Sequence, residues 1–320
     1  MSTVEMTALI CPQCGGALPK QARWRFVACP FCGVKVTKST DAVQAEHFHE
    51  SWKSYQEFLD SIPDLLVIEK NKFRILAPLG GGERADVFFG ERLGLAPERV
   101  IIKLSRDSKT EGIAEKEDGI LRSLQKMNTP TSAYFSQRLP ESICCGRLEN
   151  PEWNQREAII FRAKSGYWGS LSDVIEHQKN GIDPRHSVWI WRRILDTLGY
   201  VHEQGWTHGS VNPDHLLIQP RDHGILLIGW RKAGKSSQKG KDLRQAAHSI
   251  KALLSDPDHP GKTNSNVPAP APLLSLIDRA SEDESWCEKM GAIGIDEELR
   301  AVAEQVFGPP QFIPFYPNSK

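Results

Sequence analysis

The chain has 320 residues with 40 basic and 40 acidic side chains, so its formal net charge at pH 7 is zero. A balanced charge excludes a whole-protein field that would attract nucleic acid or an anionic membrane. The apolar and charged fractions, 39% and 25%, are typical of a soluble globular protein with one or two domains.

The first residues, MSTVEMTALICPQ, lack a basic stretch followed by an apolar one, so they are not typical of a signal peptide. Apolar runs such as LLVI and ILLI are too short to cross a bilayer. The seven cysteines form no even framework of the kind that disulfide-stabilised secreted domains use. We therefore expect a cytoplasmic protein with no membrane partner.

Two CxxC motifs stand near the N-terminus, the first formed by Cys11 and Cys14 and the second by Cys29 and Cys32. Each motif encloses a proline and is followed by a glycine, which suits a tight turn that presents two thiolates. Four thiolates at tetrahedral corners form a closed structural zinc site. Because short strands are predicted over RWRFVA and VKVTK, residues 1–40 resemble a zinc ribbon held folded by its metal. A redox dithiol is the alternative, and two matched motifs favour metal.

Residues 11–40 also carry basic and aromatic side chains and no acid. This composition is found on surfaces that bind nucleic acid, so nucleic-acid binding is kept as an alternative. We favour a structural module that docks protein. The next segment, 41–62, has apolar residues at helical spacing and predicts a connector helix. The basic residues of the first segment are Lys20, Arg23, Arg25, Lys35 and Lys38.

From residue 72 the chain predicts two strands around a glycine cluster, KFRILAPLGGGERADVFFGE. A β-branched strand, RVIIKL, then carries Lys103, and the helical pattern AEKEDGILRSLQKM carries Glu117. In this order the elements resemble the small lobe of a protein kinase, whose glycine loop has the form G-x-G-x-x-G-x-V. The resemblance implies that Lys103 holds the α- and β-phosphates of ATP and that Glu117 orients Lys103. It assigns to the nucleotide loop Gly80, Gly82 and Val87, with Ala85 in place of the third glycine.

The same resemblance implies an α+β, two-lobed kinase-like domain over residues 63–320. The β-rich small lobe would span about 72–165 and the α-helical large lobe about 166–320. Within the large lobe, Asp183 and Pro184 open a long amphipathic helix that delivers the stretch HGSVNPDHLLI. Two further helices are predicted over LLSLIDRASE and IDEELRAVAEQVF, and the aromatic C-terminal tail is expected to pack on the domain.

The catalytic loop of the family reads H-R-D-L-x-x-x-N, and this chain departs from it at the reacting positions. Ser210 stands for the aspartate that accepts the substrate proton, and His215 for an asparagine that binds magnesium. Gly229 stands for the aspartate of D-F-G, the second magnesium ligand. Serine is a very poor base, imidazole nitrogen suits a hard cation poorly, and glycine has no ligand. The segment that follows, RKAGKSSQKGK, is short and is not followed by A-P-E.

These losses predict a catalytically inactive protein-kinase-like protein, a pseudokinase, with no catalytic residue at the degenerate positions. We expect it to act as a scaffold or regulator through a protein partner, with structural zinc and no dependable magnesium site. Because the glycine loop, Lys103 and Glu117 are retained, weak ATP binding stays open. One alternative is an atypical ATP-dependent protein kinase that recruits Asp214 or Asp222. The second is nucleic-acid binding through the basic ribbon.

Overall fold

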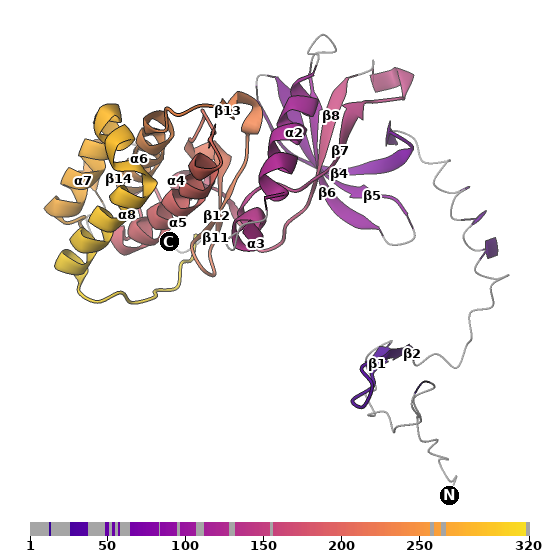
Figure 1. The fold of residues 1–320 in the computed structure, drawn as a ribbon, viewed down its shortest axis with the longest axis horizontal. Coiled ribbons are helices and arrows are strands. Elements are labelled where there is room, and N and C mark those ends of the chain that lie inside the picture. The colour runs from indigo at the N-terminus through magenta and orange to yellow at the C-terminus, as the bar shows by residue number, and fades with distance from the viewer. Residues whose placement is uncertain are drawn as a thin grey trace, which may run out of the picture. The chain divides into compact units, whose positions relative to one another are not determined.

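The computed structural model describes residues 13, 26–37, 49–50, 53–54, 57, 65–82, 84–94, 97–106, 112–127, 132–153, 156–256, 259–263 and 267–317. The chain divides into two compact units, Met1–Pro63 and Asp64–Lys320. Each unit is described by itself below, and Figure 1 shows the elements of both.

The first unit contains an antiparallel hairpin of β1 (Phe26–Ala28) and β2 (Lys35–Thr37). These are the two strands that the sequence predicts on either side of the second CxxC motif. The turn between them is closed by hydrogen bonds from the backbone N–H of Cys29 to the Val34 carbonyl (2.8 Å) and from Gly33 to the Cys29 carbonyl (2.9 Å). Gly33 has a φ of 74°, a backbone conformation that favours glycine. Of the predicted connector 41–62, residues 49, 50, 53, 54 and 57 are helical and the others lie outside the described residues.

The second unit begins with a six-stranded antiparallel sheet in the order β3-β4-β5-β6-β8-β7. Its strands alternate apolar and polar positions, and the apolar positions form a compact core of the small lobe. Strands β4 and β5 meet at the glycine cluster, as the sequence predicts. The strand bounds are β3 Leu66–Ile68, β4 Asn71–Gly81, β5 Ala85–Arg92, β6 Glu98–Ser105, β7 Ser142–Arg147 and β8 Glu157–Arg162.

Helix α2 (Ile113–Gln125) packs against this sheet and buries Ile120, Leu121 and Leu124 (Figure 1). Its first backbone N–H groups are satisfied by the buried carboxylate of Glu157 on β8, which accepts from Gly112 (2.8 Å) and Ala114 (3.4 Å). A carboxylate at this end of a helix also opposes the positive end of the helix dipole. Strand β8 therefore fixes where α2 begins.

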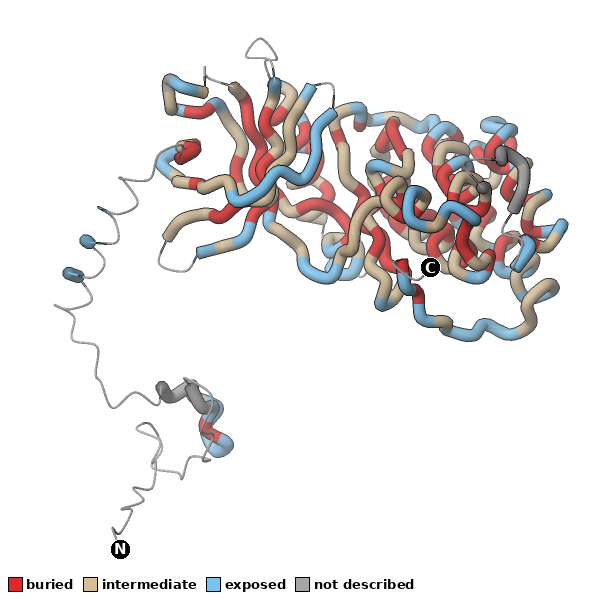
Figure 2. The backbone as a smooth tube through the Cα atoms, turned by 180° about the vertical axis from the view of Figure 1, so that it is seen from behind, coloured by how far each residue is buried: buried red, intermediate tan, exposed pale blue. Residues whose placement is uncertain are grey.

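The large lobe is built around helix α5 (Pro184–Glu203). The Asp183 carboxylate accepts from the Arg185 backbone N–H (2.9 Å), so Asp183 caps this helix as the sequence predicts. Helix α5 contributes Trp191, Ile194 and Leu198 to the core, and Figure 2 shows buried segments in red throughout this unit. The remaining helices are α3 Ser132–Phe135, α4 Leu171–His177, α6 Gly240–Leu254, α7 Ala271–Glu282 and α8 Glu284–Phe307. The 3-10 turns are η1 Ser136–Arg138, η2 Pro151–Trp153, η3 Pro213–His215 and η4 Trp230–Lys232.

Short strands carry the loops that form the candidate site. Strand β11 pairs with β12 and with β9, and β10 pairs with β13, all antiparallel. The loop between β10 and β11 contains the degenerate catalytic motif, and η4 follows β12 directly. The bounds are β9 Gly169–Ser170, β10 Trp206–Thr207, β11 Leu216–Gln219, β12 Gly224–Leu227 and β13 Gly234–Lys235.

Two elements differ from their predictions. Helix α8 begins at Glu284, eleven residues before the predicted start at Ile295, and continues through a break at Gly291 with a φ of 65°. The segment after α6, SDPDHPGKTNSNVPAPAP, has a proline-rich polar composition that predicts a loop, but it contains a short hairpin of β14 (Ser255–Asp256) and β15 (His259–Thr263).

Candidate functional site

The junction between the two lobes contains an ion pair between Lys103 on β6 and Glu117 on α2. The Lys103 Nζ donates to the Glu117 Oε2 at 2.6 Å, and the Glu117 side chain is only 2% exposed. Antiparallel register also aligns Lys103 with Val87 and Val87 with Gly80 across neighbouring strands. The structure therefore brings four of the predicted nucleotide-site residues into one region of the small lobe.

The second oxygen of Glu117 connects the small lobe to the large one. Its Oε1 accepts a hydrogen bond from the backbone N–H of Trp230 at 3.2 Å. The Trp230 indole is fully buried, and its Nε1 donates to the Leu227 carbonyl at 2.7 Å. The ring of His208 packs edge-on against the indole, with centroids 4.8 Å apart. One carboxylate thus holds both the lysine of the sheet and the backbone after β12.

The catalytic-loop backbone is held by Asp242, in the first turn of α6. Its Oδ2 accepts from the His208 backbone N–H and its Oδ1 from the Gly209 N–H, both at 2.7 Å, and His202 Nε2 lies 3.1 Å from Oδ2. Burial alone would raise the pKa of Asp242, but the hydrogen bonds from His202 and from the loop backbone hold it below its usual value. A buried carboxylate therefore fixes the position of the loop backbone.

Gly209 occupies a backbone position that a side chain would not fit. Its φ is 75°, and a Cβ built there would lie 2.8 Å from the Lys232 carbonyl oxygen. An arginine at this position would carry both a strained backbone and a clash with main-chain atoms. The path of η4 thus explains why glycine replaces the arginine of the family pattern.

Ser210 stands at the position of the catalytic base and is 7% exposed. The Asn212 Nδ2 approaches its Oγ at 3.5 Å, and Asn212 Oδ1 caps η3 by accepting from the His215 backbone N–H at 3.1 Å. Because a serine hydroxyl has no charge to attract a proton near neutral pH, this loop offers no general base at Ser210.

The two positions that would bind magnesium lie in contact, and they do not fit a divalent cation. A Cβ built on Gly229, whose φ is 82°, would lie 2.6 Å from both Cδ2 and Nε2 of the His215 ring. The His215 Nδ1 is 2.8 Å from the Ser210 carbonyl, which can only accept, so Nδ1 donates and the ring is fixed in orientation. The imidazole therefore fills the space that a carboxylate at residue 229 would need.

A small cavity of about 50 Å³ opens beside Lys103. It is lined by Lys103 with Arg84 of the glycine loop and Arg231 of η4, and by the carboxylates of Glu117 and Glu157. This volume is well below the roughly 300–1,000 Å³ of a typical small-molecule site. The sequence analysis did not identify Arg231 as a site residue, although it takes the last position of the D-F-G frame.

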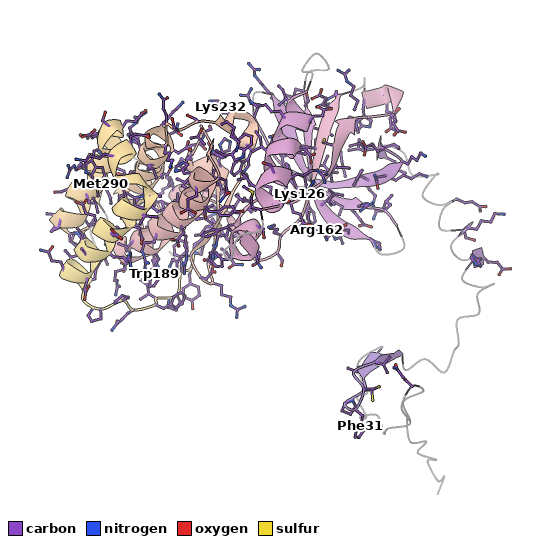
Figure 3. All side chains as sticks on the ribbon, viewed as in Figure 1. Phe31, Lys126, Arg162, Trp189, Lys232 and Met290 are labelled. Atoms are coloured by element: carbon purple, nitrogen blue, oxygen red, sulfur yellow. The ribbon has the colours of Figure 1, made fainter. Side chains whose placement is uncertain are left out.

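The segment after η4 leads directly into α6. Lys232 lies where η4 approaches α2 (Figure 3), and the next strand, β13, pairs with β10. Lys235 donates from Nζ to the Gln204 carbonyl at 2.9 Å and lies 4.3 Å from the centroid of the Trp206 ring. These contacts hold the segment against the C-terminal end of α5.

The predicted zinc site falls only partly within the described residues. Cys29 is buried and Cys32 is exposed on the turn between β1 and β2, whereas Cys11 and Cys14 lie outside the described residues. Within the described part of the chain, no cluster of three or more His, Cys, Asp or Glu side chains could hold a metal. The four-thiolate site stays a prediction. Among the helices whose residues are described, none has the length and apolar character needed to cross a membrane.

Sequence reasoning missed part of the site. The stretch DLRQAAHSIKALL predicts a helix that opens with Asp242, but it does not predict the contact of this carboxylate with the catalytic-loop backbone. The stretch REAIIFR predicts a strand, but not that its Glu157 accepts from the first backbone N–H groups of α2. Asp242 follows a basic stretch, and Glu157 stands between Arg156 and the apolar run AIIF, so neither sequence context differs from that of an exposed acid. Their burial, which makes partners necessary to offset desolvation, is visible only in the structure.

No protein-family model matches the chain. The STE20-related kinase adapter protein strd-1 of Caenorhabditis elegans is 36% identical over 64 residues, 20% of this chain and 16% of the relative. The serine/threonine-protein kinase pkn2 of Myxococcus xanthus is 23% identical over 163 residues, 51% of this chain and 18% of the relative. The maternal embryonic leucine zipper kinase of Danio rerio is 27% identical over 177 residues, 55% of this chain and 23% of the relative. The chain thus spans less than a quarter of each of these relatives.

A solved structure covers more of the chain. The crystal structure of the BubR1 kinase domain matches with a TM-score of 0.51 at 13% sequence identity, over 82% of this chain and 97% of that domain. At this identity the likeness concerns the fold. Together with the six-stranded sheet, the Lys103–Glu117 pair and the helical lobe, it shows that residues 64–320 have a protein kinase-like fold.

Proposed function

We propose that this chain is a kinase-like protein that does not transfer phosphoryl groups and acts by binding other proteins, as a scaffold or regulator. The contact between the His215 ring and Gly229 carries the proposal. In phosphoryl transfer the metal ions neutralise charge that develops on the phosphates. A carboxylate cannot enter residue 229 without displacing the imidazole, so the family's magnesium site is blocked as well as lacking its ligands.

The absence of a base at Ser210 supports the same proposal. Positioned general bases typically contribute about 10²- to 10⁴-fold to a rate. The loop frame, in contrast, is fully supported by Asp242. The loop backbone is thus held in place, while Ser210, His215 and Gly229 stand where the family has its base and metal ligands. This combination fits a binding role, because a partner protein recognises the shape of a surface and does not need a proton acceptor.

The names of the relatives include both a binding function and an enzymatic one. One is named a kinase adapter protein, which fits a binding role, and two are named kinases. An atypical kinase would need another carboxylate in the loop. Asp214 is exposed, and Asp222 is engaged elsewhere, since it pairs with Arg138 at 3.3 Å and accepts from the Gly224 backbone N–H at 2.8 Å. The enzyme is therefore the less supported alternative.

Nucleotide binding forms a subordinate part of the proposal. Lys103 and Glu117 keep the arrangement that holds phosphates in kinases, and Arg84 and Arg231 add positive charge beside them. These cations can neutralise phosphate without a metal ion. We expect any binding of ATP to be weak and independent of magnesium, because the cavity is small and the metal ligands do not fit.

Two measurements test this proposal. In the first, purified protein is incubated with radiolabelled ATP, magnesium and a generic substrate, with Lys103→Ala as the matched control; no labelling above the control is expected. In the second, ATP is titrated with and without magnesium while thermal unfolding is followed, and magnesium should add nothing to the effect of ATP. Labelling that Lys103→Ala abolishes, or a rise in Tm that requires magnesium, would refute the proposal.

For the first unit we propose a zinc ribbon in which Cys11, Cys14, Cys29 and Cys32 bind one zinc ion and which docks a protein partner. The hairpin β1–β2, with its tight turn at Cys29, supports this proposal. Metal analysis should give one zinc per chain, and Cys29→Ser should lose it. A chain without zinc would contradict the assignment. Salt-sensitive binding of DNA or RNA, lost when Arg23 and Arg25 are neutralised, would instead support the nucleic-acid alternative.

A further inference from the structure

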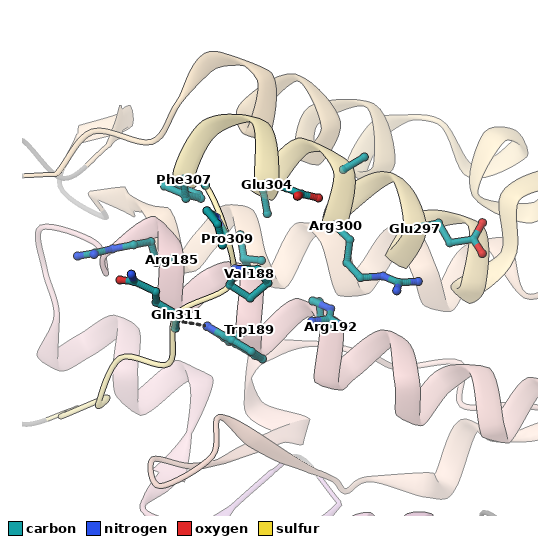
Figure 4. Close-up of a pocket in the computed structure, with 14 residues that line it drawn as sticks. Arg185, Val188, Trp189, Arg192, Glu297, Arg300, Glu304, Phe307, Pro309 and Gln311 are labelled. Atoms are coloured by element: carbon teal, nitrogen blue, oxygen red, sulfur yellow. Dashed lines mark hydrogen bonds between the residues drawn. The ribbon is translucent and has the colours of Figure 1, made fainter.

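A cavity of about 430 Å³ lies in the large lobe between helix α5 and the C-terminal half of α8 (Figure 4). Residues 308–311, which follow α8, close one side of it. Its lining includes none of the residues of the candidate site described above. The volume falls within the roughly 300–1,000 Å³ of small-molecule sites.

One part of the cavity is apolar and contains a fixed aromatic ring. The wall includes Val188, Phe307 and Pro309, with Trp189 at its base (Figure 4). The Trp189 Nε1 donates to the Gln311 carbonyl at 3.4 Å, so the indole is held by the segment that closes the cavity. The ring also stacks with His223, with centroids 6.3 Å apart, and the guanidinium carbons of Arg192 and Arg193 lie 5.7 and 6.0 Å from its centroid. Trp189 therefore serves as a fixed wall that also places the Arg192 guanidinium beside the apolar part of the cavity.

The other part of the cavity holds two guanidinium groups that share one carboxylate. The Arg192 Nε lies 2.9 Å from Asp296 Oδ1, and the Arg300 Nε lies 3.0 Å from Asp296 Oδ2. In both contacts it is the Nε nitrogen, and not the terminal Nη pair, that meets Asp296. Two cations on one carboxylate leave a net charge of +1, and a guanidinium fork matches the two oxygens of a carboxylate.

Three other charged side chains line the cavity, those of Arg185, Glu297 and Glu304. Arg185 is committed to Asp183, to which its Nε and Nη2 donate three hydrogen bonds of 2.6–3.2 Å. Figure 4 shows Glu297 beyond Arg300 at one end of the cavity and Glu304 along its upper wall. A negatively charged ligand group therefore has one favourable position, beside Arg192 and Arg300.

We propose that this cavity binds a small aromatic carboxylate. The ring of the ligand packs against the apolar wall of Val188, Phe307 and Pro309, and its carboxylate accepts hydrogen bonds from Arg192 and Arg300. A neutral ligand of the same shape fills the apolar part but leaves both guanidinium groups without their acceptor. The site is independent of the degenerate catalytic loop and of the role proposed for it.

Calorimetric titration of the full chain with 4-phenylbutyrate, and with the neutral 4-phenylbutyramide of nearly the same shape, tests this proposal. We expect the acid to bind at least about tenfold more tightly than the amide. Arg300→Gln should weaken binding of the acid about tenfold and leave the amide unchanged, because charge-assisted hydrogen bonds are lost only for the acid. Arg185→Gln is the matched control: it removes another arginine of the lining and should leave both affinities unchanged.

A second variant tests the location. Ala301 is exposed and lines the cavity, so Ala301→Trp should fill the space without unfolding the protein and should abolish binding. Unfolding curves confirm that each variant is folded. The proposal is overturned if no heat of binding is measured at millimolar acid, if acid and amide bind equally, or if Ala301→Trp binds as the wild type does.

Discussion

Replacing Gly229 by aspartate restores the residue that protein kinases use to bind magnesium, yet we expect it to destabilise this protein without restoring a metal site. The φ of Gly229 is 82°, and left-handed backbone at a non-glycine residue costs about 1–2 kcal/mol. The new Cβ would lie 2.6 Å from the His215 ring, and forcing atoms into a packed site costs about 1–3 kcal/mol more. The free energy of unfolding should fall by about 2–5 kcal/mol.

Urea unfolding, followed by the near-ultraviolet circular dichroism of the tryptophans, measures this loss. Gly234→Asp is the matched control, because no atom lies within 4 Å of a Cβ built there and its φ is not positive. That variant should stay within about 0.5 kcal/mol of the wild type. Adding His215→Ala to Gly229→Asp removes the ring, so the two substitutions should be coupled by about 1–3 kcal/mol in a double-mutant cycle.

The reasoning fails if Gly229→Asp is as stable as the wild type. It fails equally if millimolar magnesium raises the Tm of this variant and not that of the wild type, since the aspartate would then have reached a metal. Either result would mean that the His215 ring moves aside readily, and the proposal of a blocked magnesium site would lose its main support.

Three further predictions concern buried titratable side chains and their partners. Asp242→Asn should lower the free energy of unfolding by about 2–4 kcal/mol in urea, because the loop loses charge-assisted hydrogen bonds. Lys103→Met should cost about 1–3 kcal/mol by leaving Glu117 buried without its cation, and Lys103→Arg should recover part of that loss. Burial and the neighbouring His186 lower the pKa of His223 from 6.5 to about 4, so as the pH falls from 6.5 to 4 the unfolded chain takes up this proton first. The contribution of His223 to the free energy of unfolding is constant above pH 6.5 and falls by up to about 3 kcal/mol as the pH drops to 4. Urea unfolding at several pH values should show this fall in the free energy of unfolding. The variant His223→Asn should show a smaller dependence on pH.

Sequence reasoning predicted the elements whose signals are local. Asp183 followed by a proline marks the start of α5, and the β-branched stretch around Lys103 marks a central strand; the structure has both. The pairing of Lys103 with Glu117 was predicted because the kinase frame fixes their separation along the chain. These features depend on nearby residues or on a known frame, so one sequence is enough to identify them.

Features that depend on contacts across the fold could not be predicted. The sequence shows that residue 229 is glycine, but not that the ring of His215 lies against it. The predicted helix covered only IDEELRAVAEQVF, whereas α8 begins eleven residues earlier, because packing against α5 and α6 supports the helix through the break at Gly291. Prediction from local preference fails where tertiary contacts outweigh it.

The hydrogen bond from the Trp230 backbone N–H to Glu117 has a consequence for how this protein tolerates mutation. A main-chain donor is supplied by every amino acid except proline, so the donor of this bridge does not depend on the side chain of residue 230, while the buried indole contributes its own packing and its hydrogen bond to Leu227. The same carboxylate also holds Lys103, so one buried side chain links the sheet of the small lobe to the backbone after β12. A variant that changes the side chain of residue 230 and one that removes the Glu117 carboxylate should therefore affect the contact between the lobes through different groups.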